Sequence, residues 1–205
     1  MPKETNLDTS TEERLKEAAR IVFTRNGYAA TKVRDIAAEA NINLALVNYY
    51  FRSKEKLFHL IMTETIQGLF EKIRPIINDE TTTLVEKIES IVDHYLELLL
   101  ANPDFPLFIV NELMAGSTTL PAMTDNGRMF LNSHFFKQLR QLVPEGKIQF
   151  HPVNVVMNML GMIVFPFLMR PILFKSGVID EAEFRRIIEQ RKKLIPLWLS
   201  DIIHN

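Results

Sequence analysis

Side chains that can bond nucleotide bases and phosphates are concentrated between residues 31 and 56. Asn48, Tyr49 and Tyr50 follow one another, so on a helix at most one of them can point fully inward. A carboxamide can pair with a base edge, and a phenol can bond a phosphate oxygen. The cations that surround this group in the sequence are Arg34, Arg52, Lys54 and Lys56. The competing interpretation is that the tyrosines are half-buried packing residues and that the charges form a solvated face.

An amphipathic helix must precede these side chains in order to position them. An apolar stripe at i, i+3, i+4 and i+7 predicts this helix, and the stripe consists of Val33, Ile36, Ala37 and Ala40. Thr31 is the predicted N-cap, because its hydroxyl can accept a bond from a free backbone N–H of the first turn.

A second helix is predicted after a very short turn. Asn41 tolerates the left-handed conformation that ends many helices, and Asn43 can cap the next helix. The inward residues of that helix are expected to be Val47 and Phe51, which lie four apart. Because only residues 41–43 separate the two helices, they must cross sharply, as in a helix-turn-helix unit.

An ordered set of short motifs surrounds this unit. It comprises Arg25-Asn26-Gly27-Tyr28, Thr31, Asp35-Ile36-Ala37, Ala40, Tyr49-Tyr50-Phe51 and Ser53-Lys54-Glu55-Lys56-Leu57. With these motifs, the segment from Thr9 to about Gln67 resembles the DNA-binding domain of the TetR family of bacterial repressors. Three positions depart from the family pattern: Asn41 and Ala45 replace frequent glycines, and Asn48 replaces a frequent tyrosine. The operator sequence of relatives is therefore not expected to transfer to this chain.

The resemblance implies a dimer that places two recognition helices in successive major grooves of a roughly palindromic operator. Transferred by position, the residues expected at bases or at the sugar-phosphate edge are Leu44, Ala45, Leu46, Asn48 and Tyr49, and Asn43 is also expected in the DNA-binding surface. Those expected at phosphates are Thr31, Lys32, Arg34, Tyr50 and Lys54. Asn48 is the predicted residue for direct readout, since asparagine can form two hydrogen bonds with adenine.

Composition favours a folded protein without export or disulfide chemistry. The apolar fraction of 47% in 205 residues is sufficient for a full core. The chain has no cysteine and begins with a polar stretch that lacks a signal core, so a cytoplasmic location is expected. The net charge is −1, which gives no global signal for nucleic acid and does not favour a polybasic, non-specific DNA binder. Residues 1–58 carry ten Lys and Arg against eight Asp and Glu, which suits a small local footprint on DNA.

Helical periodicity without a strand pattern predicts an all-α fold of about nine helices. A helix-turn-helix DNA-binding domain is expected at residues 8–68, with its motif at about 31–51, and a helical effector-binding and dimerisation domain at 69–205. Beyond the two motif helices, the predicted helices cover residues 10–26, 54–73, 84–100, 104–114, 121–143, 152–175 and 180–203. Ser10 should cap the first helix with Glu13, and Pro75 should end the helix that begins at residue 54. The helix at 121–143 should be loosened at Gly127.

The last two predicted helices are more apolar than a monomer needs. A pair of them from each subunit would form an intersubunit four-helix bundle, and the resemblance implies this mode of dimerisation. The predicted interface residues are Val153, Val156, Met157, Leu160, Ile188, Leu194, Ile195 and Trp198. The alternative is that these side chains belong to a core within one subunit.

An effector pocket is expected in the middle of the chain if the resemblance extends that far. Aromatic and methionine walls suit a mostly apolar ligand, and a few polar groups could orient it. The candidate residues are Phe105, Phe108, Asn111, Met114, Phe130, His134, Asn158, Met162 and Phe165. Each of them could equally be ordinary core packing or, for the polar ones, be paired with another.

Catalysis, metal binding and membrane insertion find little support in the sequence. There is no Gly-rich phosphate loop, nucleophile elbow or thiol, so no enzyme activity and no cofactor are expected. His94 and Glu97 lie three apart, as in di-iron bundles, but a second such pair is missing. The longest apolar run, residues 159–169, is too short to span a bilayer. A dimeric ligand-binding or scaffold protein with a degenerate DNA-binding head remains the alternative to a regulator.

Overall fold

The computed structural model describes residues 4–115, 127–143 and 151–204, and every regular element in these ranges is an α-helix. The predicted all-α fold is therefore confirmed. The chain divides into two compact units. The first, here called the head, comprises residues 1–67 with 102–105, and the second, here called the body, comprises residues 68–101 with 106–205.

The head contains three helices and the first part of a fourth. They are α1 (Glu4–Ala30), α2 (Val33–Ala40), α3 (Leu44–Phe51) and α4 (Lys54–Asn78), whose last residues belong to the body. The predicted inward residues of α1 are confirmed, since Leu15, Ala19, Val22 and Phe23 are buried. They share a core with Ile36 and Ala37 of α2, Val47 and Phe51 of α3, and Leu57, Phe58 and Ile61 of α4.

Two predicted helix limits are wrong. Helix α1 begins at Glu4 rather than at Ser10, because extending a formed helix by a turn costs little even for weak helix formers. Helix α4 continues through Pro75 to Asn78. Pro75 cannot donate a hydrogen bond to the carbonyl of Glu71, but both residues are exposed, so water can bond that carbonyl.

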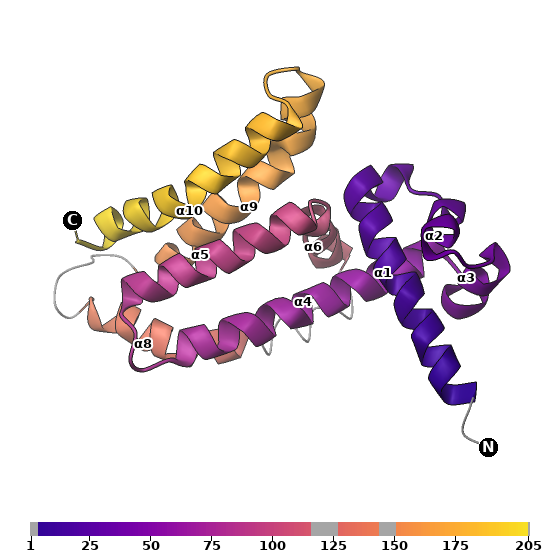
Figure 1. The fold of residues 1–205 in the computed structure, drawn as a ribbon. Helices are drawn as coiled ribbons and strands as arrows, with labels where there is room; N and C mark the ends of the chain where they lie inside the picture. The colour runs from indigo at the N-terminus through magenta and orange to yellow at the C-terminus, as the bar shows by residue number, and fades with distance from the viewer. Residues whose placement is uncertain (1–3, 116–126, 144–150, 205) are drawn as a thin grey trace. The chain divides into compact units, whose positions relative to one another are not determined.

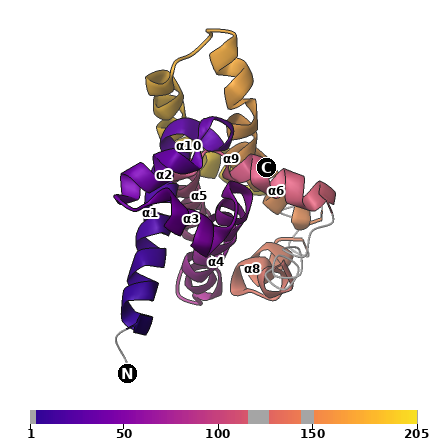
Figure 2. The same ribbon diagram turned by 90° about the vertical axis from the view of Figure 1, so that its right-hand side faces the viewer.

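The body is built on three long helices that pack on one another (Figure 1). They are α5 (Leu84–Ala101), α9 (Val153–Lys175) and α10 (Glu181–His204). Helices α9 and α10 form a hairpin, drawn in orange and yellow in Figure 2, and their limits lie within a residue of the predicted ones. Asp180 caps α10, since its carboxylate accepts a bond from the Glu183 N–H at 2.7 Å.

The shorter helices of the body differ from the prediction in one respect. Helix α6 (Phe105–Ala115) lies where it was expected, but the predicted continuous helix at 121–143 is broken. Residues 127–131 are helical, and a new helix, α8 (His134–Gln141), begins after Ser133. The Ser133 hydroxyl accepts a bond from the Phe136 N–H at 3.3 Å, so a serine cap, not Gly127, divides the segment. Residues 121–126 lie outside the described ranges.

A proline in α9 is compensated by an arginine from α10. Pro166 has no N–H to donate to the carbonyl of Met162, four residues earlier. The guanidinium of Arg191 donates to that oxygen twice, at 3.2 and 2.8 Å, and lies 5.5 Å from the centre of the Trp198 ring. The side chain therefore joins α9 to α10 at the point where α9 lacks its own hydrogen bond.

Candidate nucleic-acid interface

The turn between α2 and α3 has the predicted geometry. Asn41 adopts the left-handed conformation (φ 52°, ψ 48°), and the Ile42 N–H donates to the carbonyl of Ala37 at 2.9 Å, as in a Schellman motif. The Asn43 side chain accepts a bond from the Ala45 N–H at 2.9 Å. Arg14 of α1 donates to the carbonyl of Ala40 at 2.9 Å, which adds a cation at the carboxyl end of α2. Both asparagine roles are confirmed.

Helix α3 buries one face and presents the other to solvent. Val47 and Phe51 are buried, as predicted, whereas Tyr49 is 74% exposed and Tyr50 is half-buried. The other exposed residues of the helix are Leu44, Ala45, Leu46 and Asn48. Because α3 carries no charged residue, its exposed face can contact bases through shape, methyl groups and the single carboxamide of Asn48.

Exposed cations precede and follow this uncharged helix in the sequence. Lys32, Arg34, Arg52 and Lys56 are exposed, and the only ion pair described for Arg34 is a loose one, 3.9 Å from Asp35. Exposed cations next to an uncharged helix can bind phosphates while the helix meets the groove.

Thr31 does not have its predicted role as an N-cap. It is 2% exposed, and its hydroxyl donates to the carbonyl of Gly27 at 2.8 Å. Gly27 ends the regular part of α1 with φ 74° and ψ 161°, which leaves its carbonyl available to residue 31. The start of α2 is capped instead by the Asp35 carboxylate, which accepts a bond from the Lys32 N–H at 3.0 Å. The Thr31 hydroxyl is therefore committed inside the head and is not offered to a phosphate.

Lys54 has internal partners that the sequence did not indicate. Its ammonium donates to the carbonyls of Tyr28 and Thr31 at 2.8 and 3.0 Å and lies 4.2 Å from the centre of the Tyr28 ring. Burial, and secondarily the negative charge of Glu55, raises the pKa of the Tyr28 phenol. Lys54 thus holds the segment between α1 and α2, and at most one of its three N–H bonds remains for a phosphate.

We expect Lys54→Ala and Lys56→Ala to distinguish a lysine that stabilises the head from a lysine that binds phosphate. Lys54→Ala should lower the free energy of unfolding by about 2 kcal/mol, because it removes hydrogen bonds from a charged donor. Lys56→Ala, at an exposed position, should leave stability unchanged and lower the salt slope of DNA binding by about one. Urea titration and binding over a salt series measure the two quantities, and unchanged stability of Lys54→Ala would contradict its contacts with the two carbonyls.

A partly buried ionic cluster joins α1 to α4 within the head. Lys16, which is 7% exposed, lies 2.9 Å from Glu64, and Arg20 binds the second oxygen of the same carboxylate at 2.5 Å. Burial by itself would lower the pKa of Lys16, but hydrogen bonds to Glu13 and Glu64 outweigh it and raise that pKa. No pattern within α1 indicated this cluster, since Glu64 lies far away in the sequence.

The structure divides the predicted dimer residues into two groups. Ile188 and Ile195 are completely buried within the subunit, so their assignment to the interface is wrong: they lie on the face of α10 that packs on α5 and α9. Val153, Val156 and Leu194 are half-buried, and Met157, Leu160 and Trp198 are exposed. The outer stripe of α9 and α10 is defined here as six exposed apolar residues: Met157, Leu160, Phe165, Ile172, Leu197 and Trp198.

The nine predicted pocket residues do not share one environment. Phe105 and Phe108 are buried, and Phe130, His134 and Met162 are half-buried. Asn111, Met114, Asn158 and Phe165 are exposed, so in one subunit they face solvent. Asn158 and Phe165 point away from Val155, Met159, Ile163 and Phe167, which are the buried residues of α9.

The His94 and Glu97 pair has other partners. The Nδ1 atom of His94 lies 2.7 Å from the carbonyl oxygen of Ser90, and Glu97 binds Lys192 at 3.3 Å. Among the residues that the structure describes, no three His, Asp or Glu side chains form a metal-binding group.

Two helices that cross sharply after a short turn, with the second helix exposed, form the arrangement found in helix-turn-helix DNA-binding proteins. Residues 15–61 match the profile of "Bacterial regulatory proteins, tetR family". Over these residues the chain is similar to the DNA-binding domain of the TetR family of transcriptional regulators.

Curated relatives include transcriptional regulators, and solved structures share the fold. The chain is 22% identical over 171 residues to the "Probable HTH-type transcriptional regulator YttP" of Bacillus subtilis, covering 79% of each chain. It is 30% identical over 106 residues to the HTH-type transcriptional repressor NicS of Pseudomonas putida, covering 50% of this chain and 48% of NicS. Its fold is similar to that of the transcriptional regulator FadR from Bacillus subtilis in complex with stearoyl-CoA, with a TM-score of 0.56, 18% identity, and coverage of 90% of this chain and 97% of FadR.

Proposed function

We propose that the protein is a dimeric, cytoplasmic repressor that binds a roughly palindromic operator and is released by a small, mostly apolar effector. The observation that carries the DNA-binding part is the exposed, uncharged face of α3 between exposed cations. Two such heads in one dimer would read two half-sites about one helical turn apart.

The outer stripe supports dimerisation. Helix α9 is long and apolar enough to cross a membrane by length and composition, and only 22% of its most apolar window is buried within the subunit. Its buried residues recur every four positions and pack in the body core, so the apolar surplus lies on the opposite face. The same face carries a row of exposed apolar side chains, among them Phe165, which is 59% exposed, and Met157, which is 63% exposed. A second copy of the chain would remove this row from water in an isologous interface.

Asn48 is proposed as the residue that reads a base. It is exposed on α3, one position beyond the buried Val47, and its carboxamide is the only side-chain amide on that helix. Two hydrogen bonds to the major-groove edge of adenine would distinguish this base from the other three.

Asn48→Ala is expected to relax discrimination at one base position in each half-site by about 1–3 kcal/mol. Binding to a panel of operators with single substitutions measures the change, and Glu80→Ala, at an exposed position of the body, serves as a control that alters no residue of the head. If Asn48→Ala keeps the full sequence preference of the wild type, another residue reads that base.

An apolar effector is supported by the composition of the body and by a structural relative. FadR, whose fold this chain shares, is described in complex with stearoyl-CoA, a ligand with a long apolar tail. Phe108 is buried in the body, and burial raises the pKa of the Tyr95 phenol on α5 to about 12. A neutral phenol at neutral pH can donate a hydrogen bond to the polar end of such a ligand. The effector would bind better to a conformation in which the heads are wrongly spaced for DNA.

Fluorescence anisotropy on DNA from immediately upstream of the gene, against scrambled duplex and over a salt series, tests the proposal. Tight binding that prefers the upstream fragment, with a steep dependence on salt, is the expected result. Equal weak binding to both duplexes calls for selection from random duplexes. If no sequence is selected, the protein is a ligand-binding or scaffold protein whose head no longer binds DNA specifically.

A further inference from the structure

The three residues that join α5 to α6, together with the first residue of α6, belong to the head. Helix α5 ends at Ala101 and α6 begins at Phe105, and residues on both sides group with the body, whereas Asn102–Phe105 groups with residues 1–67. The segment is therefore connected through the backbone at both ends to body helices, although its packing partners lie in the head.

Asp104 of this segment accepts a hydrogen bond from the backbone of the head. The Tyr28 N–H donates to its Oδ2 atom at 2.6 Å. Tyr28 follows Gly27, whose φ of 74° is available to glycine at little cost. A Cβ atom on residue 27 would lie 3.6 Å from the same carboxylate oxygen, so the carboxylate sits directly over the point where α1 ends.

Further hydrogen bonds link Tyr28 to the helix-turn-helix unit. The carbonyl of Tyr28 accepts a bond from Lys54, which also donates to the carbonyl of Thr31, and the Thr31 hydroxyl donates to Gly27. Helix α2 begins two residues after Thr31, at Val33. Asp104, Tyr28, Lys54 and Thr31 thus form one chain of hydrogen bonds from the segment at 102–105 to the start of α2.

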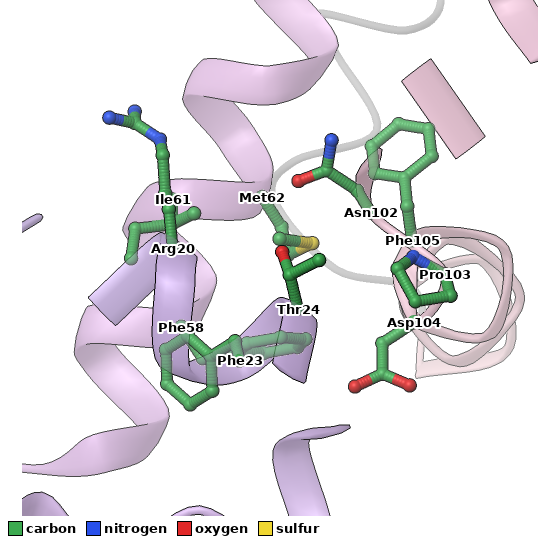
Figure 3. Close-up of a pocket in the computed structure, with 10 residues that line it drawn as sticks. All are labelled: Arg20, Phe23, Thr24, Phe58, Ile61, Met62, Asn102, Pro103, Asp104 and Phe105. Atoms are coloured by element: carbon green, nitrogen blue, oxygen red, sulfur yellow. The ribbon is translucent and has the colours of Figure 1, made fainter. Parts of the chain in front are cut away.

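The surroundings of Asp104 form a contact surface and leave no room for a ligand. Figure 3 shows residues 102–105 opposite side chains of α1 and α4, with Asn102 and Phe105 on one side and Phe23, Phe58 and Met62 on the other. The free volume between them is about 10 Å³, which is at most the space of one water molecule. The apolar contacts hold the segment on the head, and the carboxylate adds a directional bond.

We propose that Asp104 is a positioning residue that fixes the start of α2 to the segment joining α5 and α6, and so sets the placement of the recognition helix for the operator. The inference rests on the proposed function, because it assigns Asp104 a role in specific DNA binding. Any displacement of α5 or α6 would reach α2 through this chain of hydrogen bonds.

The test compares Asp104→Ala, Asp104→Asn and the exposed control Glu80→Ala, all as full-length chains. Asp104→Ala should weaken operator binding about tenfold, the effect of losing one hydrogen bond to a charged group. Its affinity for scrambled duplex should stay within about twofold of wild type, since the exposed cations are unchanged. Hydrogen exchange of the Tyr28 amide should become at least about tenfold faster, because its acceptor is gone. Asp104→Asn retains an acceptor oxygen, so its operator affinity and its Tyr28 amide exchange should be close to those of wild type. Glu80→Ala should match wild type.

Operator affinity of Asp104→Ala equal to or above that of wild type overturns the proposal, as does equal weakening on operator and scrambled duplex. Unchanged exchange at Tyr28 also overturns it, because the hydrogen bond would then not protect the amide. A wild-type chain without any operator preference would instead contradict the proposed function, and the exchange measurement still tests the bond itself. Circular dichroism at the assay temperature verifies that each variant is folded.

Discussion

Phe165→Glu is expected to convert the proposed dimer into a monomer and to lower operator affinity about a thousandfold, to the level of non-specific binding. Phe165 lies in the middle of the outer stripe and is 59% exposed, so the substitution should leave the fold of one subunit intact. In a two-fold interface the new carboxylate occurs twice and would be buried without a partner, which costs several kcal/mol. A single head then contacts only one half-site.

Sedimentation velocity measures the oligomeric state, and anisotropy measures the operator affinity of the same sample. Val178→Glu is the matched control, because Val178 is an exposed apolar residue outside the outer stripe, in the turn between α9 and α10. It should remain dimeric and bind like wild type. A Phe165→Glu protein that stays dimeric would exclude the outer stripe as the interface and return Phe165 to the list of pocket candidates.

Arg191→Ala is expected to lower the free energy of unfolding by about 3 kcal/mol, because it removes two charge-assisted hydrogen bonds and leaves the carbonyl of Met162 unpaired. For a chain of this size the melting temperature should fall by about 6–12 °C. Arg186→Ala on the same helix is the control. Arg186 makes an exposed ion pair with Glu183, and such pairs contribute less than about 1 kcal/mol.

A double variant identifies the cause of this loss. Pro166→Ala restores the backbone N–H that can bond Met162 within α9, so Arg191→Ala should cost about 1 kcal/mol less in that background. Thermal unfolding of the four proteins at one concentration gives the coupling. Equal costs in both backgrounds would mean that Arg191 stabilises the hairpin through Trp198 or bulk packing, and not through the carbonyl that Pro166 leaves free.

Local signals in the sequence predicted the parts of the site that depend on a few neighbouring residues. The left-handed turn at Asn41, the cap at Asn43 and the inward face of Val47 and Phe51 all follow from backbone preferences and helical period. The limits of α5, α9 and α10 followed from long apolar periodicity for the same reason. The prediction for Pro75 was wrong because it treated proline as a helix terminator, whereas the carbonyl of Glu71, which lacks its helical partner, is on an exposed residue and can bond water.

Which face of an apolar helix meets the core was not determined by the sequence. Ile195 and Phe165 are both apolar residues on long apolar helices, yet the first is fully buried and the second is 59% exposed. The difference depends on how α5, α9 and α10 pack on one another, which no single helix encodes. The exposed apolar residues of the outer stripe could therefore be recognised only from the packing of the three helices.

The sequence by itself determined that the chain is helical and carries a helix-turn-helix unit with an uncharged, hydrogen-bonding recognition helix, because these properties come from residue type and spacing. Only the tertiary structure decided what Thr31, Lys54 and Asp104 contact. Thr31 donates to the carbonyl of Gly27, and Asp104 accepts from the N–H of Tyr28. Lys54 donates to the carbonyls of Tyr28 and Thr31. Backbone carbonyls and amides occur at every residue, so no residue type marks them as partners. Tyr28 and Asp104 are 76 positions apart in the sequence, and only folding brings them into contact.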